Sequence, residues 1–203
     1  MSTKRKEEIV LAALELAAEK GLANVSMSMI ADKIGIKKPS LYKHFDSKNE
    51  IVEAMYQYHR QQAREKANIK SVDCSTLFTG KTAREVLQTT VQGYTQMNQQ
   101  GQMLNFYKVI YSERSVQPMA AKIVAEETRK MIMAIKQLFY AIEVHKMLHF
   151  ENVDMSAVSF AMTIHGLMDF ELDRSYGECK EVESDKNLLD NYLKWFCEEN
   201  AVK

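Results

Sequence analysis

The sequence predicts an all-α fold, with an N-terminal group of three helices followed by a larger helical bundle, about nine helices in all. Composition and periodicity lead to this prediction. Only two prolines and seven glycines occur in 203 residues, and long helices tolerate little of either residue. Apolar residues also recur at the helical spacing through most of the chain. We expect almost no strand, and a core that needs no disulfide.

The first predicted helix covers residues 3–20. Ile9, Val10 and Leu14 fall on one broad apolar stripe, and lysines and glutamates lie largely opposite it. Gly21 follows, and glycine commonly ends a helix because it adopts the left-handed conformation without strain. This pattern predicts an amphipathic helix packed on a core.

Two short helices come next. Ser26 is a good N-cap for a second helix over residues 27–34, which Gly35 ends. The third helix covers residues 38–45 and has Pro39 in its first turn, where the missing N–H costs nothing.

A capping box formed by Ser47 and Glu50 opens a fourth helix, which reaches about residue 68. Residues 72–81 have no clear helical period, so we expect a loop there. The remaining predicted helices cover residues 83–99, 102–113, 118–147, 155–176 and 185–200.

Charge is distributed unevenly along the chain. The formal net charge is zero, yet residues 33–48 hold five lysines against one acid, Asp46. Residues 178–203, in contrast, hold seven acids and four lysines. This segregation indicates one surface suited to a polyanion.

The second and third helices, joined through Gly35 and Ile36, have the layout of a helix-turn-helix. Leu41 and Phe45 are four residues apart, so they share a face that can anchor the third helix. The polar side chains then point outward, where they can meet base edges and phosphates. Lys48 lies at the start of the fourth helix, where the positive dipole end also favours phosphate. The candidate DNA-binding residues are Ser26, Ser28, Lys37, Lys38, Pro39, Ser40, Tyr42, Lys43, His44 and Lys48.

Two alternatives stay open for this segment. Its lysines can be merely solvated on a surface helix of a bundle. Tyr42 can stack on the first helix as half-buried core, or it can reach a phosphate, and such rings often do both.

Residues 25–51 resemble the DNA-binding segment of the tetracycline-repressor (TetR) family of bacterial transcriptional regulators. The resemblance includes the apolar first helix and spans about the first quarter of the chain. Lys37 departs from the family pattern, which commonly has Ser or Thr there as a helix cap, so a weaker cap is expected. The matching positions are Ser26, Ile30-Ala31, Gly35-Ile36, Leu41-Tyr42, His44-Phe45 and Ser47-Lys48.

The resemblance implies a DNA-binding domain over residues 1–47 and a ligand-sensing and dimerisation domain over residues 48–203. It also implies a transcriptional regulator and not an enzyme. Such a regulator is commonly a repressor that a small hydrophobic or amphipathic inducer releases from double-stranded operator DNA. Family members pair through their last two helices.

A dimer is expected on physical grounds as well. Residues 155–168 carry no charge in fourteen residues, so the helix must be covered on both sides. The alternative is a monomer in which this helix is the central helix of the core. Symmetric dimers are the commonest oligomers. The candidate interface residues are Val158, Met162, Leu167, Phe170, Leu189, Tyr192, Leu193 and Phe196.

The middle helices are rich in methionine and aromatic residues, which are adaptable liners for an apolar pocket. Plain core packing is the alternative for each of these side chains. The candidate effector-binding residues are Tyr94, Met97, Phe106, Tyr107, Met131, Met162 and His165.

Other functions find little support in the sequence. His145 and His149 lie four apart near Glu143, yet we expect no metal there and no cofactor elsewhere. Three scattered cysteines and the absence of a signal core indicate a cytoplasmic protein outside the membrane. The main alternative is a helical-bundle carrier or enzyme that binds a small molecule or lipid but no DNA. A regulator controlled by a protein partner is a further alternative.

Overall fold

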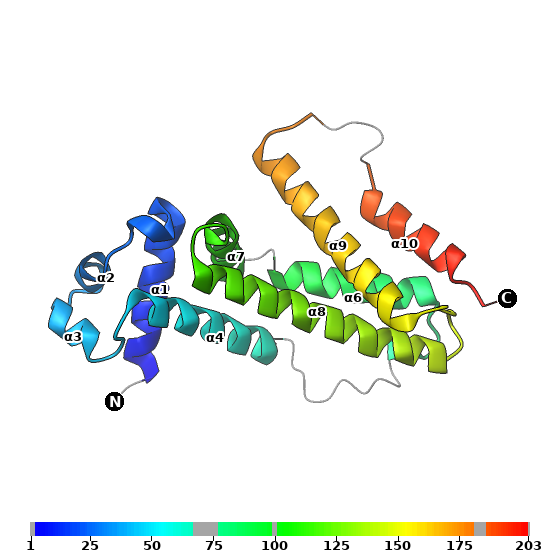
Figure 1. Cartoon of the computed structure of the whole chain (residues 1–203), viewed down its shortest axis with the longest axis horizontal. Helices are drawn as coiled ribbons and strands as arrows, with labels where there is room; N and C mark the ends of the chain where they lie inside the picture. Colours follow the sequence, from blue (N-terminus) through cyan, green and yellow to red (C-terminus); the bar gives the residue numbers. More distant parts are fainter. Residues whose placement is uncertain (1–2, 67–76, 99–100, 181–185, 203) are drawn as a thin grey trace. The chain divides into compact units, whose positions relative to one another are not determined.

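The structure is a computed structural model that describes residues 3–66, 77–98, 101–180 and 186–202. Every regular element in these ranges is a helix, and they comprise nine α-helices and one short 3-10 helix, η1 (Figure 1). The predicted all-α fold is therefore confirmed. Residues 72–76 of the predicted loop lie outside the described ranges, and the prediction is wrong at Leu77 and Phe78, which are helical.

For the nine α-helices named next, each end lies within three residues of its predicted position. The elements in chain order are α1 (Thr3–Lys20), η1 (Leu22–Asn24), α2 (Met27–Lys33), α3 (Lys38–Tyr42), α4 (Lys48–Lys66), α6 (Ala83–Asn98), α7 (Gly101–Glu113), α8 (Pro118–Val144), α9 (Val153–Tyr176) and α10 (Leu188–Glu199).

The predicted N-terminal caps form as expected. The Ser26 hydroxyl accepts a hydrogen bond from the amide of Met29 at 3.2 Å. The Ser47 hydroxyl accepts one from the amide of Glu50 at 3.2 Å, while the Glu50 carboxylate reaches back to the amide of Asp46 at 2.6 Å. These contacts satisfy amides that a helix N-terminus otherwise leaves without partners.

Helix α8 ends three residues earlier than the sequence predicts. Lys146 adopts a left-handed backbone conformation with φ 54°. Its amide donates to the Glu143 carbonyl at 2.9 Å, and the Met147 amide donates to the Ile142 carbonyl at 3.1 Å. These two bonds form a Schellman closure, which glycine usually makes. Because lysine stands at this position, the sequence carries no stop signal there.

The chain divides into two compact units, one formed by Met1–Lys70 with Met97–Glu127 and the other by Ser71–Gln96 with Thr128–Lys203. The domain boundary predicted at residue 47 separates a DNA-binding function from a ligand-sensing and dimerisation function. It stays a prediction. Helix α8 contributes its residues 118–127 to the first unit and residues 128–144 to the second.

The core of the first unit is built around α1. This helix packs on α2, α4, α7 and η1, and its apolar stripe is almost wholly buried. The largest fully buried side chains of this core are Ile9, Leu14, Ile30, Leu41, Ile51, Met55, Tyr56, Phe106 and Ile110.

Aromatic rings fill the core of the second unit. The Phe139 ring stacks on Phe150 with their centroids 4.5 Å apart, and Phe160 and Phe196 pack around it at 5.2 and 5.6 Å. Tyr192 of α10 closes the group against Phe160 at 5.8 Å. Helices α8, α9 and α10 are thereby held together by large apolar surfaces.

Among the described helices, none combines the length and apolar character that a bilayer crossing requires.

Candidate nucleic-acid interface

Helix α3 is anchored by its apolar underside, as predicted. Leu41 is 0% exposed and Phe45 is 2% exposed, and both belong to the core of the first unit. Lys6 of α1 lies over the Phe45 ring, with its Nζ 5.1 Å from the ring centroid. A five-residue helix is marginal on its own, so this burial holds α3 in place.

Three exposed lysines lie on α3 and at its two ends. Lys37, Lys38 and Lys43 are exposed, and no acidic side chain among the described residues forms an ion pair with them. Pro39 is exposed, whereas Ser40 is partly buried. Free ammonium groups on a fixed helix are suited to an anionic partner, because no internal pair has to be broken first.

Tyr42 faces outward with its neighbours. Its ring is 43% exposed and lies below the Lys38 ammonium, whose Nζ is 6.0 Å from the ring centroid. At this exposure the ring is still about half covered, so both alternatives for Tyr42 stay predictions. His44 is partly buried and follows the last turn of α3.

The two outer lysines of the basic segment have partners within the chain. The Lys33 ammonium pairs with Glu15 of α1 at 3.1 Å. The Lys48 ammonium donates to the backbone carbonyls of Leu22 at 2.8 Å and Val25 at 3.1 Å, and approaches that of Ala23 at 3.4 Å. The cluster available to an anionic partner therefore centres on the three lysines around α3.

The helix-turn-helix keeps its predicted cap pattern. Lys37 is the N-cap of α3 and makes no side-chain capping bond, as its departure from the Ser or Thr pattern implied. Its carbonyl instead accepts from the amide of Ser40 at 2.8 Å. Ser26 is exposed and caps α2, while Ser28 within α2 is partly buried. Gly35 adopts φ 67° in the connection, which requires glycine-like freedom.

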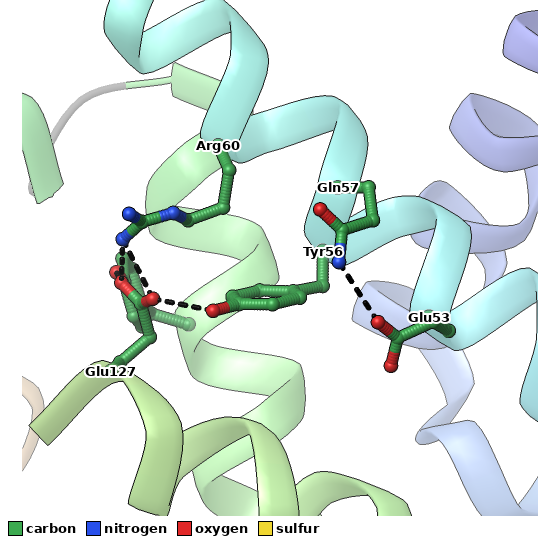
Figure 2. Close-up of polar contacts among 6 residues, drawn as sticks. Glu53, Tyr56, Gln57, Arg60 and Glu127 are labelled. Atoms are coloured by element: carbon green, nitrogen blue, oxygen red, sulfur yellow. Dashed lines mark hydrogen bonds and ion pairs between the residues drawn. The ribbon is translucent and has the colours of Figure 1, made fainter. Parts of the chain in front are cut away.

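A polar cluster in the first unit was not predicted from the sequence. The Glu127 carboxylate of α8 accepts hydrogen bonds on both oxygens from Arg60 at 2.7 and 2.9 Å, and one from the Tyr56 hydroxyl at 2.7 Å (Figure 2). The Tyr107 hydroxyl of α7 donates a further hydrogen bond to Oε2 of Glu127 at 3.3 Å. Burial, and then the hydrogen bond to Glu127, raise the pKa of Tyr56. Tyr56 and Arg60 are one turn apart on α4, but their partner is 67 or more residues distant, so no local spacing signals the contact.

The predicted effector-binding residues fall in both compact units. Phe106 and Tyr107 belong to the first unit, where the Phe106 ring is buried beside Tyr56 with centroids 6.4 Å apart. The side chain of Met97 lies outside the described residues. The assignment of these side chains to an effector stays a prediction.

The second unit holds the other four predicted effector-binding residues. Met131 is buried and Tyr94 partly buried in the core, whereas Met162 is 50% exposed. His165 lies with its Nδ1 3.4 Å from the carboxylate of Asp169, one turn further along α9.

The predicted dimer residues separate into exposed and buried sets. Leu193 and Phe196 are buried in the core of their own unit, so they have little surface left for a partner. Met162 and Phe170 are exposed on α9. Val158, Leu167, Leu189 and Tyr192 are partly buried. Met155 of α9 and Trp195 of α10 are exposed as well.

The two histidines considered as metal ligands have separate partners. His145 stacks on Phe78 with centroids 4.4 Å apart, whereas His149 Nδ1 lies 3.1 Å from Glu143. Among the described residues no group of three metal-ligating side chains is found.

The fold and this interface define an all-helical protein with an anchored N-terminal helix-turn-helix. Residues 9–55 match the family model "Bacterial regulatory proteins, tetR family". The match places a TetR-type DNA-binding domain in the N-terminal quarter of the chain.

Curated relatives are similar in this N-terminal region. The transcriptional activator FasR of Mycolicibacterium smegmatis is 40% identical over 55 residues, 27% of this chain and 25% of FasR. The negative regulator IcaR of the Staphylococcus aureus biofilm operon is 46% identical over 48 residues, 24% of this chain and 26% of IcaR. The matched segment thus spans about a quarter of the length of these relatives.

Solved structures are similar over the whole chain. A protein of Mesorhizobium loti MAFF303099, classed with the TetR-family regulators, has a TM-score of 0.72 at 18% identity, with 100% of both chains covered. The flavonoid-responsive regulator FrrA has a TM-score of 0.70 at 19% identity, again with 100% of both chains covered. At these identities the likeness establishes the fold.

Proposed function

We propose that this protein is a homodimeric transcriptional regulator that binds operator DNA through α3 and responds to a small apolar or amphipathic effector. The observation that carries the proposal is the set of three exposed lysines without acidic partners among the described residues, fixed around a helix whose underside is buried. Lys37, Lys38 and Lys43 neutralise phosphates or reach guanine edges, while Tyr42, Ser40 and His44 complete the contact.

The test is the salt dependence of binding to the DNA that flanks the coding region of this chain. Removing one phosphate contact lowers the slope of log affinity against log salt by about 0.9. We expect Lys37→Ala and Lys43→Ala each to flatten the slope by up to that amount. The matched control is Lys180→Ala, an exposed lysine of the second unit, which should leave the slope unchanged.

Binding that is absent at low salt, or slopes that are the same for all variants, would reject the α3 interface. In that case the alternative of a helical-bundle carrier without DNA binding becomes the better account. Copurified lipid or another small apolar molecule would then be the expected finding.

The proposed dimer buries a stripe of α9. Met155, Met162 and Phe170 recur along one side of the helix, each at least 41% exposed in the single chain, and Gly166 lies between them with nothing within 4 Å of an added Cβ. Large apolar residues beside a small one are suited to close helix packing. Trp195 of α10 adds apolar area. A symmetric pair would place two copies of α3 on half-sites about 34 to 36 Å apart.

The effector acts by population shift in this proposal. Suppose that a compound binds the bundle better when the spacing of the two α3 helices does not match the two half-sites. Such a compound lowers operator affinity without touching the DNA. A coupling of about 1 to 3 kcal/mol changes that affinity about 5- to 150-fold. FrrA, which shares the fold, is flavonoid-responsive, and this supports a ligand-controlled function for the fold.

We propose repression as the mode of control and the cytoplasm as the site of action. One relative is an activator and another a negative regulator, so a reporter gene behind the flanking DNA decides the sign. Expression that rises when this chain is deleted supports repression, and expression that falls supports activation.

A further inference from the structure

The connection between α1 and α2 is held by side chains from two other helices. After Gly21, which has φ 77°, the chain forms η1 and then Val25 before α2 begins. The α1–α2 connection, defined here as residues 21–25, lies over the core of the first unit. Side chains from α4 and α7 form hydrogen bonds with its backbone carbonyls and with one of its backbone amides.

Lys48 holds the carbonyl end of this connection. Three backbone carbonyls lie within hydrogen-bond distance of its Nζ, namely those of Leu22 at 2.8 Å, Val25 at 3.1 Å and Ala23 at 3.4 Å. An ammonium group has three protons, so these acceptors can use all of them. Little donor capacity is left for a phosphate on DNA.

Glu113 of α7 holds the amide side of the same connection. Its Oε1 accepts a hydrogen bond from the Ala23 amide at 3.3 Å, and its side chain is only 7% exposed. The Lys48 ammonium thus binds the carbonyls of Leu22, Ala23 and Val25, and the Glu113 side chain binds the Ala23 amide. Hydrogen bonds to charged groups are about twice as strong as those between neutral ones.

We propose that Lys48 and Glu113 are positioning residues that clamp the α1–α2 connection between α4 and α7, and thereby fix the placement of α2 and α3. Two connections tie α2 and α3 to the rest of the first unit: residues 21–25 before them and residues 43–47 after them. Lys48 directly follows the second connection and its side chain binds the first, so a single residue joins both. The expected effect on operator affinity rests on the proposed DNA binding, whereas the clamp itself does not.

The clamp and a phosphate contact predict opposite results for one substitution. Lys48→Met removes the ammonium but keeps most of the apolar length. If Lys48 clamps the connection, operator affinity falls by a similar factor at every salt concentration, about tenfold, since one charge-assisted hydrogen bond is of that order. The salt slope stays that of the wild type. If Lys48 binds phosphate, the slope flattens by about 0.9.

The experiment combines salt titration with hydrogen exchange on the full-length protein. Amides of residues 21–26 should exchange faster in Lys48→Met and in Glu113→Met than in the wild type. Glu113→Gln should restore protection, because its amide oxygen can still accept from Ala23. The matched control Lys43→Met, at the C-cap of α3, should flatten the salt slope and leave exchange at residues 21–26 unchanged.

Unchanged exchange at residues 21–26 in both Lys48→Met and Glu113→Met would overturn the clamp. A flattened slope in Lys48→Met with normal exchange would overturn it as well, and would assign the residue to DNA. If the wild type binds no DNA, the proposed function fails, and hydrogen exchange alone still decides whether the clamp exists.

Discussion

The polar cluster around Glu127 offers the sharpest test of the forces within the first unit. Glu127→Gln removes the charge that Arg60 pairs with and replaces one acceptor oxygen by a donor group. The Arg60 side chain is 28% exposed and that of Glu127 15% exposed, so the pair is largely shielded from water. Tyr56 also loses the ionised acceptor at 2.7 Å from its buried hydroxyl.

The expected cost follows from these contacts. Removing one partner of a buried ion pair costs about 3 to 5 kcal/mol, and the remaining exposure of Arg60 lowers this to about 2 to 4 kcal/mol. In a chain of this size each kcal/mol corresponds to about 2 to 4 °C, so Tm should fall by roughly 4 to 16 °C. Thermal unfolding followed by circular dichroism measures the change.

The adjacent residue supplies the control. Glu126 also lies on α8, but its contact is a long ion pair with exposed Lys122 at 3.9 Å, so Glu126→Gln should change stability by less than about 0.5 kcal/mol. A double-mutant cycle with Arg60→Met should show strong coupling to Glu127 and none to Glu126. Equal Tm values for the two glutamine variants would refute the reasoning.

Three other predictions concern single side chains. The raised pKa of Tyr56 means that its stabilising effect is complete below about pH 10, the unfolded value, and is lost as pH rises further. Urea midpoints between about pH 8 and 11 should therefore fall less for Tyr56→Phe than for the wild type. Phe139→Ala should cost about 3 to 5 kcal/mol in a urea melt, because the ring is 0% exposed amid three other phenylalanines. Gly166→Leu should leave the chain folded but monomeric in light scattering, whereas Gly93→Leu, at an equally open helical glycine, should stay dimeric.

Most of the fold was predictable because its signals are local. Ser26 and Ser47 cap helices through contacts three residues along the chain, and Gly21 ends α1 with the positive φ that glycine permits. Lys146 makes the same kind of turn as a glycine would, so the end of α8 was placed too late. The predicted helix ends are right where the residue is of a type that commonly adopts the observed backbone conformation.

The candidate interface was predictable in its centre but less so at its margins. Lys37, Lys38 and Lys43 lie at the two ends of the helix that buries Leu41, and all three are exposed as expected. The partners of the outer lysines lie far along the chain: Glu15 for Lys33, and the carbonyls of residues 22–25 for Lys48. Contacts of this kind depend on packing, and helical spacing carries no information about them.

The broad apolar stripe of α1 shows why the helix-turn-helix is coupled to the helices beyond it. A stripe that buries Ile9, Ala13, Leu14 and Leu16 is wider than one neighbouring helix can cover, and α1 accordingly packs on α2 and also on α4 and α7. The surface that holds α2 and α3 is therefore continuous with the surface that holds α7. Because packed cores deform little, a shift of α4 or α7 must carry α1 with it or open a cavity. A separable DNA-binding domain ending at residue 47 would lack this property, since its core would have to close without α4 and α7.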